Sequence, residues 1–267
     1  MIRERAPAKV NLLLHVGPRR PDGLHELCSL FASIDLADEL TVEAADADEV
    51  VCPGVEGPNL AFAAVERFRA DAAPELPPLR VTIDKRVPVA AGLGGGSGDA
   101  AAVLRAANEL AGRPLAPDGL RALGAKVGAD VPSQVEPRHA LVTGAGEVVE
   151  PVALPPMTLL LVPDPAGLAT AEVYAQADAL GTIRETLDPG RARELAGRPL
   201  DQLAAALEND LEAAAVSLRP ELSGRMDALR QAGALAARVT GSGPTVFGVF
   251  PAGEARELEG AIRAEVS

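Results

Sequence analysis

The sequence predicts an α+β fold, and three observations support that class. At 267 residues the chain is long enough to bury one large core or two smaller ones. Apolar residues make up 48% of the chain, which excludes a disordered protein. Strand-like alternation and helical spacing of apolar residues both occur, but the two patterns do not follow each other in strict succession. This order favours α+β over a doubly wound parallel sheet.

The first half, residues 1–153, is expected to form an N-terminal domain. Apolar positions with a period of two predict strands, and positions with helical spacing predict helices. The predicted strands are 8–17, 38–44, 79–85, 139–144 and 147–152, and the predicted helices are 58–72, 97–112 and 120–128. The helix over 97–112 is expected to end at Gly112 and Pro114, which are helix-stop signals.

The second half, residues 154–267, is expected to form a C-terminal domain. Its predicted elements are a strand at 157–164, helices at 170–180, 200–216 and 219–232, a strand, glycine turn and strand over 236–250, and a last helix to about residue 265. The Pro- and Gly-rich region 186–199 is expected to be a loop or insertion.

Composition excludes several function classes. No apolar run is long enough to span a bilayer, and the charged start MIRERAPAKV lacks the apolar stretch of a signal peptide, so we expect a cytoplasmic protein. A net charge of −13 repels nucleic acid and anionic membranes, so neither is an expected partner. Cys28 and Cys52 are too few for a disulfide framework and are expected to be reduced core residues.

Lysine is rare in this chain, since 22 of the 25 basic residues are Arg. The lysines are Lys9, Lys85 and Lys126. Arg does not replace Lys where a compact ammonium or a tunable pKa is needed. Lys9 and Lys85 are therefore candidates for function, whereas Lys126 is expected to be a surface residue.

The stretch GLGGGSGDAA, residues 92–101, is a candidate anion site. It is neither a P-loop nor a dinucleotide fingerprint, because no GK[ST] follows and Ser97 stands where the last Gly is required. Its glycines can turn N–H groups toward one point, Ser97 can cap, and the following helix adds its positive dipole end. The alternative is a turn that caps a core helix. Lys85 and Arg86 just upstream favour phosphate.

Three further stretches allow two interpretations each. In PAKVNLLLHV, Lys9 and Asn11 share one face of a strand and either enter one site or lie on the surface. In GADVPSQV, Asp130 is either an N-cap or turn residue or a carboxylate that accepts a proton. The glycines of VTGSGPTVFG, residues 239–248, form a tight hairpin or bring backbone amides to a ligand.

In this order, PAKVNLLLHV, PVAAGLGGGSGDAA and RVTGSGPTVFGVF resemble the three motifs of the GHMP kinase superfamily. The likeness extends to the members that phosphorylate a cytidine diphosphate-linked methylerythritol in the non-mevalonate (MEP) route to isoprenoid precursors. It includes RRPDGLHELCSLFASIDLADEL (19–40), GPNL (57–60), IDKRVP (83–88), GADVP (128–132) and LENDLE (207–212). The resemblance implies two α/β subdomains, with ATP bound by the N-terminal one (1–153) and the active site in the cleft between them.

The resemblance also implies ATP and Mg²⁺ as cofactors, the 2-hydroxyl of the substrate as phosphoryl acceptor, and a monomer or weak homodimer. Asp130 is then the catalytic base, and Lys9 keeps it ionised. The implied substrate contacts are Asn11, His25, Phe31, Thr170 and Tyr174, with His25 and Tyr174 at cytosine. The implied ATP site comprises Asn59, Lys85, Pro88, Val89, Ala90, Ala91, Gly92, Leu93, Gly94, Gly95, Gly96, Ser97 and Gly98.

Two positions depart from the family pattern. Leu24 stands where members have Tyr before the His, so one face of a bound cytosine would contact an aliphatic side chain. Gly98 replaces a Ser of the glycine loop, which removes a hydroxyl from the expected surroundings of phosphate and metal; no metal ligand is assigned. Two alternative functions remain for the chain. It is either a kinase of the homoserine or mevalonate type, or a catalytically silent relative that binds nucleotide or metabolite and acts as a regulator.

Overall fold

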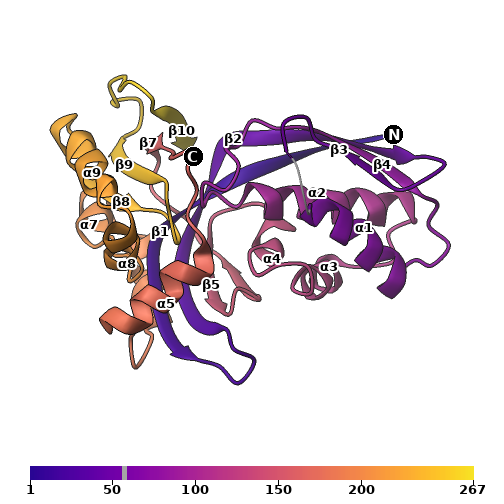
Figure 1. Ribbon diagram of the computed structural model, residues 1–267, viewed down its shortest axis with the longest axis horizontal. Coiled ribbons are helices and arrows are strands. Elements are labelled where there is room, and N and C mark those ends of the chain that lie inside the picture. Colours follow the sequence, from indigo (N-terminus) through magenta and orange to yellow (C-terminus); the bar gives the residue numbers. More distant parts are fainter. Residues whose placement is uncertain (56–58) are drawn as a thin grey trace.

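Two β-sheets, flanked by helices, form the framework of the protein (Figure 1). The structure is a computed structural model that describes residues 1–55 and 59–267. Within these residues the first sheet has the order β3-β4-β2-β5-β6, with β1 paired to β2, and the second has the order β10-β7-β9-β8. This arrangement confirms the α+β class.

The strands of the first sheet come from the first half of the chain. They are β1 (Ile2–Arg19), β2 (His25–Ala44), β3 (Glu49–Val51), β4 (Leu79–Asp84), β5 (Ala140–Gly144) and β6 (Val148–Pro151). On one side of this sheet lie α1 (Leu60–Asp71), α2 (Gly95–Leu110), α3 (Pro117–Gly124) and the short α4 (Val131–Gln134) (Figure 1). The alanine-rich face of α2 is buried against α1 and the sheet.

The second sheet consists of β7 (Met157–Val162), β8 (Ala236–Val239), β9 (Val246–Pro251) and β10 (Ile262–Val266). The helices of this half are α5 (Thr170–Leu180), α6 (Pro189–Ala196), α7 (Leu200–Ala205), α8 (Glu212–Leu218) and α9 (Glu221–Gln231). Among the described residues, no helix is both long and apolar enough to cross a membrane.

The β1–β2 hairpin contacts both halves of the protein. Its middle part contributes Leu12, Leu13 and Leu30 to a core cluster that also contains Leu159 and Phe247 of the second sheet. Strand β2 is much longer than the predicted strand 38–44. The prediction missed its middle part, because those residues are buried on both faces and lack the alternation that signals a strand. Register shifts in β1 flank Lys9 and Asn11.

Three predicted elements of the second half are wrong. The expected last helix is strand β10, whose Ile262, Ala264 and Val266 have the period of a strand and extend the sheet beside β7. The expected loop at 186–199 contains α6, which Asp188 caps by accepting a hydrogen bond from the backbone N–H of Arg191. The expected helix 200–216 is broken into α7 and α8.

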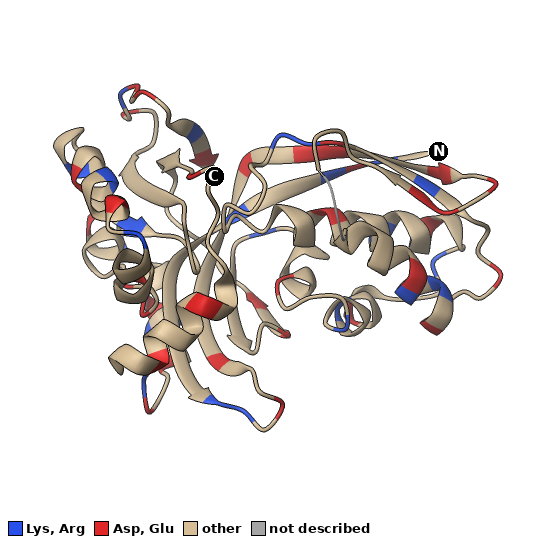
Figure 2. Cartoon of the chain, viewed as in Figure 1, with Lys and Arg blue, Asp and Glu red and all other residues tan. Residues whose placement is uncertain are grey.

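Charged residues of both signs are spread over the two halves (Figure 2). Lys126 is exposed and pairs with Asp71, as a surface residue should. Both cysteines are free thiols; Cys28 is buried, and burial raises its pKa to about 11, whereas Cys52 is only half-buried. Only Cys28 is therefore the expected core cysteine.

Candidate active site

Lys9 and Asn11 lie next to each other on one face of β1, as their spacing predicts. The Lys9 ammonium donates to Asn11 Oδ1 at 2.6 Å, and it lies 4.8 Å from the centre of the Phe31 ring. Asn11 Nδ2 in turn donates to Ser29 Oγ at 2.9 Å. Only 4% of Lys9 is exposed, so its charge is held in one place by buried neighbours.

Asp130 faces the Lys9 ammonium. The turn between α3 and α4 places Asp130 Oδ2 at 3.2 Å from Lys9 Nζ. Asp130 occupies the N-cap position of α4, yet its side chain makes no cap hydrogen bond, so the simple capping role is not observed. A carboxylate with 33% of its side chain exposed, beside a buried cation, is accessible to a bound hydroxyl.

The glycine stretch closes tightly around Lys9. Gly94 is the N-cap of α2 in the left-handed conformation, with φ of 70°, and a Cβ there would lie 2.9 Å from Lys9 Cγ. Gly92 is also left-handed, and a Cβ there would lie 2.8 Å from the carbonyl oxygen of Gly243. The two glycine motifs thus meet at Gly92, where a side chain would force them apart, and a side chain at Gly94 would displace Lys9.

The start of α2 has the uncapped geometry that the predicted anion site requires. Helix α2 begins at Gly95, and no side chain caps it, so the N–H groups of its first turn are available to an anion together with the helix dipole. The expected cap by Ser97 is wrong, because Ser97 lies within the first turn. This turn faces a cavity of about 440 Å³.

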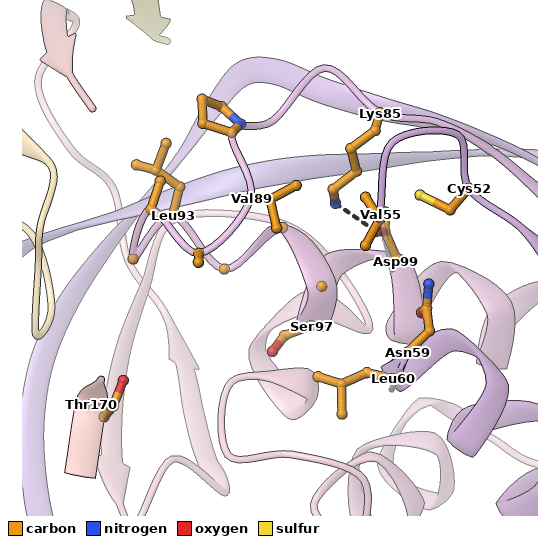
Figure 3. A pocket seen from close by; sticks show the side chains of 17 residues that line it. Cys52, Val55, Asn59, Leu60, Lys85, Val89, Leu93, Ser97, Asp99 and Thr170 are labelled. Atoms are coloured by element: carbon orange, nitrogen blue, oxygen red, sulfur yellow. Dashed lines mark hydrogen bonds and ion pairs between the residues drawn. The ribbon is translucent and has the colours of Figure 1, made fainter. Parts of the chain in front are cut away.

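Most of the expected ATP residues line this first cavity. Figure 3 shows Asn59, Lys85 and Ser97 around it, with Thr170 on the opposite side. Of GPNL, residues 57 and 58 lie outside the described residues. The expected ATP residues that line the cavity are Asn59, Lys85, Pro88, Val89, Ala90, Ala91, Gly92, Leu93, Gly94, Gly95, Gly96 and Ser97. Cys52 and Asp99 line it as well.

Gly98 does not line this cavity but packs against β1. A Cβ at this position would lie 3.3 Å from the carbonyl oxygen of Pro7 and 3.5 Å from Cβ of Ala6. The side chain that the family has here would therefore begin toward the strand, away from the first cavity. The expected contact of position 98 with ATP has no geometric support in this structure.

Lys85 lies near the glycines, but its charge is neutralised by two carboxylates. Lys85 Nζ donates at 2.6 Å to Asp38 Oδ2 and at 2.6 Å to Asp99 Oδ2, and both acids are buried. Burial raises the pKa of Asp99 to about 6, with Asp38 adding to the rise and Lys85 opposing it. Arg86 pairs with Asp84 instead. The two cations upstream of the glycines are thus engaged in ion pairs with protein carboxylates.

A second cavity, of about 340 Å³, surrounds the Lys9–Asp130 pair. Asn11, Phe31, Gly94, Ser97, Thr170 and Tyr174 also line it. A third cavity, of about 540 Å³, contains His25, Leu24, Tyr174 and Asp178. Gly92, Gly94 and Ser97 line the first and second cavities, Tyr174 lines the second and third, and Thr170 lines all three. The three cavities therefore adjoin, with the ion pair in the middle one.

Tyr174 and His25 face each other in the third cavity. Their ring centres are 5.4 Å apart and their planes are tilted by 36°. Burial raises the pKa of Tyr174, and the nearby Asp130 charge raises it further, so the phenol stays neutral. All five expected substrate residues thus line either the middle or the third cavity.

Comparison with known proteins shows which family the chain belongs to. Residues 59–136 match the family model of the GHMP kinases N terminal domain, and residues 186–267 match that of the GHMP kinases C terminal domain. The 4-diphosphocytidyl-2-C-methyl-D-erythritol kinase of Kineococcus radiotolerans is 42% identical over 92% of this chain and 80% of its own. The chain belongs to the 4-diphosphocytidyl-2-C-methyl-D-erythritol kinase family of GHMP kinases.

One further relative and two solved structures are similar to this chain to different extents. The relative from Mycobacterium tuberculosis is 43% identical over 90% of this chain and 79% of its own. A crystal structure of a 4-(cytidine 5'-diphospho)-2C-methyl-D-erythritol kinase superposes with a TM-score of 0.79 and 33% identity, covering 99% of this chain and 98% of that one. A homoserine kinase from Cytophaga hutchinsonii has a TM-score of 0.69 at 18% identity over 95% of this chain and 86% of that one, which shows the fold alone.

Sequence reasoning on this kinase missed two residues that shape the site. Asp38 holds the loop before the glycines, because its Oδ1 accepts from the backbone N–H groups of Arg86 and Val87. Thr240 Oγ1 accepts from the backbone N–H of Asn11 at 2.9 Å. Both contacts join segments far apart in the chain, and no local pattern signals such a contact.

Proposed function

We propose that this chain transfers the γ-phosphoryl group of ATP to the 2-hydroxyl of the methylerythritol portion of 4-diphosphocytidyl-2-C-methyl-D-erythritol, in the MEP pathway. The single observation that carries the proposal is the succession of three adjoining cavities with the Lys9–Asp130 pair in the middle one. ATP would occupy the glycine-lined cavity, and the cytidine end of the substrate would occupy the cavity of His25 and Tyr174.

In this assignment Asp130 is the general base. It accepts the proton of the substrate hydroxyl as the oxygen attacks the γ-phosphorus, and the bond from that phosphorus to the β,γ-bridging oxygen breaks. Lys9, at 3.2 Å, keeps the carboxylate ionised before transfer and stabilises negative charge as it develops. Asn11 and Phe31 hold the ammonium in place, so little reorganisation is needed during the reaction.

The uncapped first turn of α2 supports phosphate binding. Its backbone N–H groups and its dipole supply positive potential without a side-chain cation, in a protein whose net charge is −13. Because the backbone supplies the positive potential, the cavity can accept an anion even though two carboxylates neutralise the charge of Lys85.

The donor set of the site fits Mg²⁺, which prefers hard oxygen ligands and often uses one or two carboxylates together with substrate phosphates. The Ser97 hydroxyl lines both the first and the middle cavity, and the Asp130 carboxylate lines the middle one. We propose that the Ser97 hydroxyl would contact the metal, while the Asp130 carboxylate stays free of it to act as the base. When bound, Mg²⁺ supplies neutralisation of the charge on the transferring phosphoryl group.

We also propose that the chain divides into two domains, 1–153 and 154–267. The last strand of the first sheet ends at Pro151 and the first strand of the second begins at Met157, so the connecting segment is short. The site would then lie between the domains, since Lys9 comes from one and Tyr174 from the other.

The test is a direct assay of the purified protein with ATP, Mg²⁺ and the cytidine diphosphate substrate, followed by mass analysis of the product. Homoserine and mevalonate serve as parallel acceptors, and substrate without ATP serves as the blank. We expect ADP release and a product heavier by one phosphoryl group with the cytidine substrate only. Release of ADP with homoserine or mevalonate instead, or no release with any acceptor, would contradict the proposal.

A further inference from the structure

The segment LENDLE before α8 contains an asparagine, Asn209, to which the proposed reaction assigns no role. This segment runs beside β1. The backbone N–H of Leu14 donates to the carbonyl oxygen of Glu208 at 2.9 Å, and the N–H of Asp210 donates to the carbonyl oxygen of Leu14 at 2.9 Å. Asn209 is thereby held between the strand that carries the catalytic lysine and the glycine turn of VTGSGPTVFG.

The side chain of Asn209 forms three hydrogen bonds to the backbone. Its Nδ2 donates at 2.8 Å to the carbonyl oxygen of Val239 and at 2.8 Å to that of Gly241. Its Oδ1 accepts from the backbone N–H of Leu211 at 2.9 Å. These partners also fix the orientation of the amide, because only its nitrogen can donate to two carbonyl oxygens. One side chain therefore holds the backbone on both sides of Thr240.

Thr240 connects this turn to Asn11. Thr240 is buried, and its Oγ1 accepts from the backbone N–H of Asn11 at 2.9 Å and lies 3.5 Å from Asn11 Oδ1. The next residue, Gly241, has φ of 58°, and a Cβ there would lie 3.2 Å from Asn11 Oδ1 and 3.8 Å from Lys9 Nζ. The turn thus packs against the same amide oxygen that accepts a hydrogen bond from the Lys9 ammonium at 2.6 Å.

We propose that Asn209 is a positioning residue, which holds the glycine turn against Asn11 and so keeps the Lys9 ammonium beside Asp130. This inference rests on the proposed function, because it takes the Lys9–Asp130 pair as the reacting centre. Asn209 is not among the described residues that line the three cavities, so it acts through the turn and not through a ligand. A misplacement of catalytic groups by about 1 Å can lower a rate about 10²-fold.

The main test variant is Asn209→Asp, which keeps the size and the acceptor oxygen but places a second oxygen against two carbonyl groups. Asn209→Ala removes the amide without adding a charge, and it carries the same expectation if the carboxylate prevents folding. Thr240→Val removes the next hydrogen bond toward Asn11 with little change of shape. Melting curves verify that each variant is folded.

Asn108→Asp is the matched control. Asn108 Nδ2 donates to the carbonyl oxygen of Leu115 at 2.9 Å, and its Oδ1 accepts from the N–H of Leu115 at 3.0 Å. The asparagine lies near the end of α2, and it is not among the described residues that line the cavities. The control therefore loses the same kind of backbone contact at a place remote from the reacting pair.

We expect Asn209→Asp to lower kcat with the cytidine substrate by roughly tenfold to a hundredfold, with little change in the KM for ATP. Thr240→Val should lower kcat as well, and the double variant should be no slower than the slower single variant, because both act on one series of contacts. Asn108→Asp should lower Tm and leave kcat near that of the wild type. A wild-type kcat in Asn209→Asp, or effects that multiply in the double variant, would overturn the proposal.

Hydrogen exchange of the Asn11 amide, followed by NMR, requires no turnover. Because this amide donates to Thr240, it should exchange about tenfold faster in Asn209→Asp and at the wild-type rate in Asn108→Asp. Unchanged exchange in Asn209→Asp would overturn the proposal whatever the kinetics are. Faster exchange in a protein that does not phosphorylate the cytidine substrate would support the link from Asn209 to Asn11 and contradict only the proposed function.

Discussion

Replacing Lys85 by Met should destabilise the protein far more than the same change at Lys126. Lys85 is nearly buried and lies 2.6 Å from each of two carboxylates, Asp38 and Asp99, whose side chains are 0% and 4% exposed. Met has a similar length but no charge, so the substitution leaves two buried carboxylates without their shared cation. Lys126 is 58% exposed and pairs with Asp71 at the surface.

The magnitude follows from the burial. Removing one partner of a buried ion pair costs about 3 to 5 kcal/mol, because the remaining charge is desolvated and uncompensated. For a chain somewhat above 200 residues, about 2 to 4 °C of Tm corresponds to each kcal/mol. We therefore expect Lys85→Met to lower Tm by about 10 °C at pH 8. Lys126→Met should leave Tm nearly unchanged, because exposed ion pairs contribute little.

The Tm deficit of Lys85→Met should also depend on pH, in a direction set by the pKa of Asp99. In the wild type the pKa of Asp99 is about 6, above the ordinary value of 3.8, so the folded state binds this proton more tightly. The stabilisation of the folded state by this tighter proton binding is fully present below pH 3.8 and is lost as the pH rises to about 6. Without the opposing charge of Lys85, the pKa of Asp99 rises further and the loss extends to higher pH. The deficit of Lys85→Met should thus be smaller at pH 5 than at pH 8.

Melting curves followed by circular dichroism at pH 5, 6.5 and 8 measure these differences. The double variant Lys85→Met with Asp99→Asn removes one of the two uncompensated charges, and we expect it to recover part of the lost Tm at pH 8. Equal Tm values for Lys85→Met and Lys126→Met would refute the reasoning. A deficit of the same size at pH 5 and pH 8 would show that packing, not charge, is what the Lys85 side chain supplies.

Three further substitutions test the site. Asp130→Asn should lower kcat by at least about 10²-fold while the equilibrium affinity for ATP is retained, and nearly normal turnover would exclude Asp130 as base. Leu24→Tyr should raise affinity for the cytidine substrate about fivefold, from an added stacking energy of about 1 kcal/mol, and an unchanged Kd would remove the stacking argument. Gly98→Ser should lower Tm by a few degrees, because the new side chain crowds the Pro7 carbonyl, and it should leave kcat unaffected. Faster turnover of this variant would instead show that the hydroxyl reaches the phosphates.

Features that depend on local spacing could be predicted from the sequence. Lys9 and Asn11 were predicted to share a face because strand side chains have a period of two, and in the structure they do so and are joined by a hydrogen bond. The glycine stretch was predicted as an anion site at the start of a helix, and α2 begins there without a side-chain cap. Thr170 and Tyr174 were expected from the family resemblance alone; they are four residues apart on α5, and both line the second and third cavities.

Features that depend on contacts between distant segments could not be predicted. Asp38 lies 47 residues before Lys85, and no pattern in either segment indicates that the acid engages the lysine. Helical spacing after residue 252 favoured a helix, but an edge strand beside β7 buries Ala264 and Val266 instead. Gly98 was interpreted as a lost phosphate contact because motif position alone does not say which way a side chain points.

The three lysines show what lysine rarity does and does not indicate in an arginine-rich chain. Lys9 and Lys85 each place a compact ammonium among buried oxygen atoms, at 2.6 Å from Asn11 and at 2.6 Å from both Asp38 and Asp99. A planar guanidinium has a different shape and a larger volume, so it would not reproduce these short contacts of a compact ammonium. Lys126 makes one surface contact that an Arg would make equally well, and nothing in the structure requires Lys there. Rarity therefore identifies candidates, and burial among several oxygen acceptors is what separates the two constrained lysines from the third.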